Sequence, residues 1–108
     1  MTLEAEPHYQ LVLQLRSSAR EAFDAMVRLE EPLEVLLGDL GTVDGHDAGV
    51  GEVNVFILTD HPIRVFDKMR LLPEVARLLP NLRVAYRRIG GDEFQVLHPA
   101  GPYEFKIA

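Results

Sequence analysis

Residues 43–59 read VDGHDAGVGEVNVFILT, and this stretch decides the fold. Its first half places three glycines among acidic residues and a histidine, a composition typical of a tight turn. Its second half, residues 53–58, is apolar apart from Asn54. We therefore predict a hairpin whose second strand is buried on both faces and lies inside its sheet.

A strand and a helix precede this hairpin. Residues 8–15, HYQLVLQL, mostly alternate apolar with polar side chains, as a strand with one buried face does. Ser18 and Glu21 then have the spacing of a capping box, which predicts a helix that begins at Ala19. Pro32 lies inside the same apolar stripe, so we expect the helix to kink or restart there.

A second helix and a second hairpin follow. Residues 62–79 carry an apolar stripe at helical spacing, and Pro73 should kink or divide that helix. Residues 82–98 contain two β-prone runs around a glycine pair, which predicts a hairpin. The tail GPYEFKIA either adds a short strand or packs Tyr103 and Phe105 against the body.

The elements follow the order β-α-β-β-α-β-β within one predicted domain, residues 1–108. This order predicts an α+β fold, a ferredoxin-like two-layer sandwich with two helices on one face of an antiparallel sheet. Phe56 and Leu58 point to the sheet face opposite Val55 and Ile57, so large apolar side chains lie on the open face in either orientation. A second subunit, the tail or a ligand should cover them, and we predict a homodimer through this face.

Charge and composition narrow the classes of function. The net charge is −6, and residues 1–54 hold 3 basic against 11 acidic side chains, which argues against binding to nucleic acid. The absence of cysteine excludes disulfides and thiolate zinc sites. The first ten residues lack a signal-peptide pattern, and no apolar run is long enough to span a membrane. We therefore expect a soluble cytoplasmic protein without a membrane partner.

The acidic half of the opening stretch is the candidate site. If the bend is centred between Gly49 and Val50, Asp47 faces Glu52 on the neighbouring strand. The same register pairs Gly45 with Asn54 and Val43 with Phe56. Two facing carboxylates need a cation, a basic group or a proton between them, so Asp47 and Glu52 are the candidate metal ligands. Asp44 and His46 would then project from the other face, and a one-residue change in loop length would alter the pairing.

Asp44, His46, Asp47 and Glu52 have the ligand atoms that Mg²⁺, Mn²⁺ or Ca²⁺ prefer, but their spacing matches no established metal motif. An Asp–His pair can also act as general acid and base, with Asn54 donating to an oxyanion. No serine or threonine is placed as a nucleophile. We favour a plain turn, with no cofactor beyond a possible divalent metal, and an enzyme as the lesser alternative.

Arginines on the last hairpin form a second candidate surface. Arg83 and Arg87 share one face at even spacing, where they either pair with acidic groups or form a solvated outer row. The side chains that we predict to contact a partner or ligand are Asp44, His46, Asn54, Phe56, Leu58, Arg83 and Arg87.

The segment VDGHDAGVGEVNVFILTDHP, with the helix and the GGDEF hairpin that follow it, resembles small uncharacterised bacterial proteins. Those proteins carry a DGxxxGxGExxxFxxxxxxP type of segment and a ferredoxin-like order of elements. The resemblance implies a fold but no activity. The GGDEF string at residues 90–94 also resembles diguanylate cyclases, but the nucleotide-binding and metal-binding elements of those longer domains are absent.

Three functions stay open on the sequence. The first is a binding or regulatory module that acts through protein–protein contacts, as a homodimer through Phe56 and Leu58. The second is a small metal-assisted enzyme that uses the hairpin from Asp44 to Glu52. The third is an immunity-type protein that neutralises a basic partner, favoured by the small size and the acidic first half.

Overall fold

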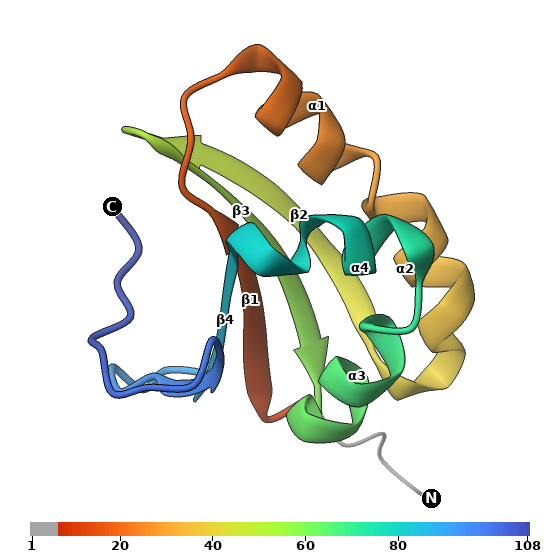
Figure 1. The fold of residues 1–108 in the computed structure, drawn as a ribbon. Coiled ribbons are helices and arrows are strands. Elements are labelled where there is room, and N and C mark those ends of the chain that lie inside the picture. Colours follow the sequence, from red (N-terminus) through yellow and green to blue (C-terminus); the bar gives the residue numbers. More distant parts are fainter. Residues whose placement is uncertain (1–6) are drawn as a thin grey trace, which may run out of the picture.

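The computed structural model describes residues 7–108 as a sheet with helices on one side and the C-terminal tail on the other (Figure 1). Residues 1–6, which belong to the stretch without a signal-peptide pattern, lie outside the described residues. No helix in the described part is both long and apolar enough to cross a membrane.

Strands and helices follow the predicted order, and each predicted helix is divided in two, one of the two outcomes expected at Pro32 and Pro73. The elements are β1 (Tyr9–Leu15), α1 (Arg20–Val27), α2 (Glu30–Leu37), a 3-10 turn (Gly38–Leu40), β2 (Thr42–Gly49), β3 (Glu52–Thr59), α3 (Pro62–Met69), α4 (Pro73–Leu78), a 3-10 turn (Leu79–Asn81), β4 (Leu82–Arg88) and β5 (Gln95–His98).

The five strands form one sheet in the order β2-β3-β1-β4-β5, and all neighbours are antiparallel. The prediction of an α+β protein with an antiparallel sheet is therefore confirmed. β3 pairs with β2 on one side and β1 on the other, so it is an interior strand, as its two apolar faces predicted. The middle strand is β1.

The prolines predicted where helices begin better than the capping box did. Pro62 and Pro73 occupy the first positions of α3 and α4, where the missing N–H has no partner to lose. Pro32 lies in the first turn of α2, so the predicted restart is confirmed. The capping box at Ser18 is wrong, because α1 begins at Arg20 without a side-chain cap.

The main core lies between the sheet and the helices. Side chains from β1, β3 and β4 that point toward the helices meet the apolar stripes of α1, α2, α3 and α4. Its buried members are Leu11, Leu13, Leu15, Met26, Leu29, Leu33, Leu37, Val53, Val55, Ile57, Val65, Phe66, Met69, Val75, Leu82 and Val84.

The face of the sheet away from the helices, the second face, carries a smaller core under the tail. Phe105 is only 5% exposed and packs with Val12 and Ala85. Alternate tail residues point inward, since Tyr103 and Ile107 join Phe105 in this cluster while Glu104 and Lys106 are exposed. The tail adds no strand, so of the two predicted alternatives it takes the packed one (Figure 1).

Candidate functional site

The register of the β2–β3 hairpin differs from the predicted one. Asp47 pairs with Asn54, Gly49 pairs with Glu52, and Val43 pairs with Ile57. The prediction that Asp47 faces Glu52 is therefore wrong by two positions. The physical reason is the turn, which closes on two residues, Val50 and Gly51, with Gly51 in the left-handed region at φ +75°.

A bulge in β2 re-aims the side chains that follow it. The register shifts between Val43 and His46, so that Asp44 and Gly45 together lie opposite the single residue Phe56. Gly45 has φ +84°, a conformation that side-chain-bearing residues rarely adopt. Asp44 is exposed at this bulge and makes no hydrogen bond or ion pair within the described part of the chain.

His46 faces the helices, on the opposite side of the sheet from the carboxylates of Asp47 and Glu52. Its Nδ1 lies 2.9 Å from Oε2 of Glu30 on α2. Its ring also meets the ring of Phe23 edge to face, with centroids 5.6 Å apart. His46 is therefore held by the helical layer, as the prediction that a sheet separates it from Asp47 requires.

Asp47 and Glu52 share an amide. The Asn54 side chain donates from Nδ2 to Asp47 Oδ1 at 2.9 Å and to Glu52 Oε2 at 2.8 Å. Gln14 Nε2 lies 3.1 Å from Asn54 Oδ1 and 3.2 Å from Glu52 Oε2. The amide donors thus supply the positive partner that two neighbouring carboxylates need.

The four candidate ligands do not converge. His46 projects toward α2, Asp44 lies on the bulge, and only Asp47 and Glu52 share a partner. Residues 7–108 contain no group of three or more His, Asp or Glu side chains placed to hold a metal ion.

The tail is fastened to the same polar cluster. The backbone N–H of Ala108 donates to Glu52 Oε2 at 3.0 Å, and Gln14 Nε2 donates to the carbonyl of Lys106 at 2.8 Å. Glu52 is only 7% exposed as a result. The buried polar residues of β1 and β3 therefore hold the tail on the second face.

Arg83 and Arg87 are half-buried and stack on aromatic rings. The Arg83 guanidinium lies 4.8 Å from the ring centre of Tyr103, and Arg87 lies 5.0 Å from that of Phe94. Arg87 Nε also donates to Gln10 at 3.0 Å. The predicted shared face is confirmed, but the row is a set of cation–π contacts instead of a solvated edge. Burial raises the pKa of Tyr103, although the charge of Arg83 opposes this.

Phe56 and Leu58 lie on the second face, as one of the two predicted orientations has it. Both side chains are half-buried, and Phe56 packs on the cluster of Val12 and Phe105. The tail, one of the three covers that the sequence left open, therefore covers part of this surface.

A polar pocket of about 340 Å³ opens beside the tail. Residues of β1, β3, β4 and the tail line it, and we call it the tail pocket. Its lining residues are Gln14, Arg16, Glu52, Arg83, Glu104, Lys106, Ile107 and Ala108.

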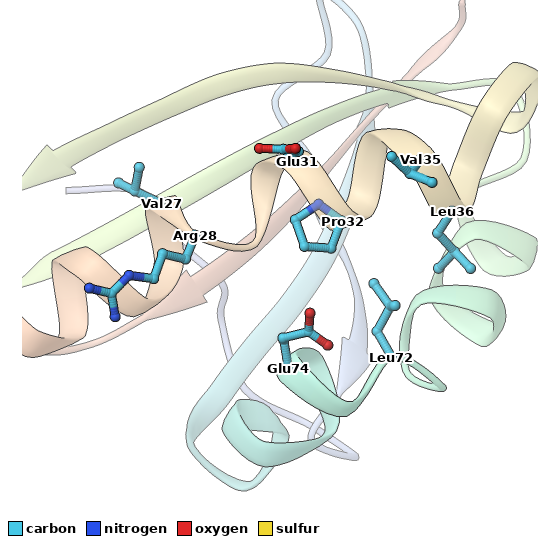
Figure 2. Close-up of a pocket in the computed structure, with 8 residues that line it drawn as sticks. All are labelled: Val27, Arg28, Glu31, Pro32, Val35, Leu36, Leu72 and Glu74. Atoms are coloured by element: carbon cyan, nitrogen blue, oxygen red, sulfur yellow. The ribbon is translucent and has the colours of Figure 1, made fainter.

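A larger apolar groove of about 810 Å³ lies in the helical layer, and we call it the helix groove (Figure 2). Figure 2 shows Pro32 and Leu36 on the α2 side and Leu72 on the opposite side. Its lining residues are Val27, Arg28, Glu31, Pro32, Val35, Leu36, Leu72 and Glu74.

The helix groove exposes apolar side chains that a folded monomer usually buries. Val35 is 81% exposed, and Leu71, next to the groove residue Leu72, is 78% exposed. Two carboxylates, Glu31 and Glu74, and the single guanidinium of Arg28 lie among the groove's lining residues. The groove thus combines an apolar floor with a charged rim, the composition of a protein contact surface.

Sequence reasoning missed both the helix groove and Gln14. Val35 and Leu36 are consecutive apolar residues on one helix, so both cannot point into the core. An apolar residue outside the core-facing stripe is the sequence feature that could have indicated the groove. Gln14 looked like an outward residue of β1, and only the position of the tail buries it.

Comparisons with protein-family models, with curated proteins and with solved structures give no match to this chain. Its function is therefore inferred from its own geometry.

Proposed function

We propose that the protein is a binding or regulatory module that contacts another protein through the helix groove. The observation that carries this proposal is the exposure of Val35 and Leu71 beside a groove of about 810 Å³. Exposed apolar surface of this kind costs free energy in water, and burial against a partner recovers it.

The charge around the groove favours a basic partner. Residues 20–40, which span α1 and α2, hold two basic and six acidic side chains, a net charge of −4. Charged residues on a rim steer association and select the partner more than they add affinity. The occupant that fits is a protein segment with two or three apolar anchors flanked by Lys or Arg, in the manner of an amphipathic helix laid in a groove.

The helix groove suits a partner better than the second face does. A homodimer through Phe56 and Leu58 would have to displace the tail, together with the buried ring of Phe105 and the hydrogen bond from Ala108 to Glu52. The helix groove needs no such rearrangement. The metal-assisted enzyme gains no support from the geometry, because Asp47 and Glu52 already share the amide of Asn54.

An immunity-type function is the second candidate, and it uses the same surface. The acidic surplus of α1 and α2 is the observation that favours it, since a basic toxin is one form of basic partner. Co-expression separates the two: an immunity protein restores growth to cells that make its toxin, and Val35→Glu in the groove abolishes that rescue.

We also propose that the first four strands form the ferredoxin-like arrangement. β1 and β2 run parallel with β3 between them, and β3 and β4 run parallel with β1 between them, as two interleaved β-α-β units require. β5 extends the sheet beyond β4. An experimental structure in which β1 did not lie between β3 and β4 would overturn this assignment.

The helix groove is tested with a pair of synthetic amphipathic helical peptides that share the same leucines. One peptide carries lysines on its polar face and the other carries glutamates. We expect the lysine peptide to bind and to shift the backbone NMR signals of Val35, Leu36 and Leu72. We expect the glutamate peptide to bind at least about tenfold more weakly, because like charges meet at the rim.

Val35→Glu is the decisive variant, and Val50→Glu is its matched control. Both valines are highly exposed, at 81% and 93%, so neither change disturbs the core. Val50 lies in the β2–β3 turn, far from the groove in the sequence and outside its lining. The proposal requires that Val35→Glu abolish binding and that Val50→Glu keep it. Equal binding by both variants, or by both peptides, contradicts it.

A further inference from the structure

The tail pocket contains a buried carboxylate with one oxygen to spare. Glu52 Oε2 accepts from Gln14, Asn54 and Ala108, at 3.2, 2.8 and 3.0 Å. Among residues 7–108 no hydrogen bond goes to Oε1, and no buried side-chain nitrogen or oxygen lacks a partner. Oε1 therefore keeps some exposure to solvent, and Glu52, which is 7% exposed, is one of the residues that line the pocket.

Two arginines line the same pocket, and neither has a carboxylate partner among residues 7–108. The ion pairs in the described part of the chain join His8 to Asp60, Arg20 to Asp24, His46 to Glu30 and Lys106 to Glu104. Neither Arg16 nor Arg83 takes part in any of them. Lys106 and Glu104 pair with each other across 3.1 Å. The charged lining groups without an ionic partner among residues 7–108 are therefore Glu52, Arg16 and Arg83, and the Arg83 guanidinium stacks on the Tyr103 ring.

The strand order brings these opposite charges together. Gln14 of β1 pairs with Asn54 of β3 and with Arg83 of β4, so the pocket spans three adjacent strands. Arg16 follows Gln14 at the spacing that returns a side chain to the same face. The continued register places Arg16 opposite Glu52, although the two form no ion pair.

We propose that the tail pocket binds a small zwitterion of the α-amino acid class. The ammonium group of the ligand donates to Glu52 Oε1, and its carboxylate accepts from Arg16 and Arg83. A volume of about 340 Å³ lies within the range of small-molecule sites and exceeds the need of one amino acid.

Simpler ions fit this pocket less well than a zwitterion. An inorganic anion would meet the arginines but would also face the carboxylate of Glu52. A metal cation would meet Glu52 and the ion-paired Glu104, but also the like charges of Arg16 and Arg83. A ligand that carries both charges satisfies both sets, and charge-assisted hydrogen bonds of this kind are the strong ones.

The test uses the full chain and free L-amino acids, added one at a time with glycine as the smallest. Acetate and methylammonium, each carrying one of the two charges, are the comparison ligands. We expect at least one amino acid to move the backbone NMR signals of Gln14, Arg83 and Lys106 in a saturable manner. Acetate and methylammonium should each bind at least about tenfold more weakly, because each lacks one charge-assisted contact.

Two variants locate the site. Glu52→Gln and Arg16→Gln should each weaken amino acid binding by about tenfold or more, and Arg16 is exposed, so its change leaves the fold intact. Glu21→Gln, an exposed change on α1, should leave binding unaltered. The proposal is overturned if no amino acid binds, if acetate binds as tightly as the amino acid, or if Arg16→Gln binds as the parent does.

Discussion

The carboxylate of Glu52, at the start of β3, accepts a hydrogen bond of 3.0 Å from the backbone N–H of Ala108, 56 residues further along the chain. This bond and the one from Gln14 to Lys106 join the tail to the sheet through its polar residues. The tail is also held by an apolar contact between Phe105 and Phe94, whose ring centres lie 4.8 Å apart. The tail is thus part of the folded core.

Phe105→Ala should release the tail from the second face. Removal of a buried phenylalanine costs about 3 kcal/mol or more in general, and we expect about 3 kcal/mol here because the tail can detach instead of leaving a cavity. Chemical denaturation gives the loss of stability, and hydrogen exchange should show protection lost at residues 103–108 first. Lys106→Ala, an exposed change in the same tail, is the control. Comparable losses in both variants would contradict the assigned role of the ring.

Asn54→Asp should be strongly destabilising at neutral pH. The change removes the donor that Asp47 and Glu52 share and adds a third negative charge between them, a loss of about 2 kcal/mol or more. Stability relative to the parent should recover as the pH falls toward about 4, where the introduced carboxyl group takes up a proton. Asn81→Asp, at an exposed site, should show neither effect in thermal melts across this range.

Asp60 should contribute a stability that disappears in acid. The hydrogen bond from the His8 side chain, at 2.5 Å, is the main cause that lowers the pKa of Asp60 below its ordinary value of 3.8. Since the folded-state pKa is depressed, the contribution is complete above the unfolded pKa and is lost as the pH falls through the folded one.

His8→Ala tests this ion pair through a carboxyl NMR titration. The pKa of Asp60 should rise toward 3.8, and the variant should lose less stability in acid than the parent does. His61→Ala should raise that pKa by a smaller amount, because the charge of His61 is the weakest of the causes. A pKa unchanged by His8→Ala would rule out the pair as the cause.

Gly45→Ala should lower the free energy of unfolding by about 1 kcal/mol, through backbone strain alone. Gly45 has φ +84°, and an added Cβ would meet no atom within 4 Å, so crowding plays no part. Gly49→Ala is the matched change in the same strand, where φ is ordinary and the nearest contact of the new Cβ is 3.5 Å. In urea denaturation the stability of Gly49→Ala should be close to that of the parent. Equal losses of stability in the two variants would contradict the assignment of strain to the bulge.

Strand positions and helix breaks could be predicted because local chemistry sets them. The apolar run at residues 53–58 needed cover on both faces, and β3 indeed has a strand on each side. Pro32 and Pro73 lack the N–H that an uninterrupted helix needs, and separate helices follow from that. These features depend on a few neighbouring residues.

The register and the sites depend on residues that are distant in the sequence. Asp47 faces Asn54 because the turn closes at Val50 and Gly51, one residue later than the spacing suggested. The alternation of side chains in the hairpin is compatible with either position of the turn. Gln14 is a buried partner of Glu52 and also donates to the carbonyl of Lys106 in the tail, 92 residues further along the chain. The sequence of β1 alone does not predict that contact.

The bulge at Asp44 and Gly45 also bears on how the protein behaves at high concentration. β2 is an edge strand, and an open edge with regular spacing is a template on which other chains add strands and aggregate. Here the bulge breaks the spacing, and exposed Asp44 and Asp47 place charge along the strand. The opposite edge, β5, is four residues long and ends just before Pro99. Both edges of the sheet therefore resist intermolecular strand addition.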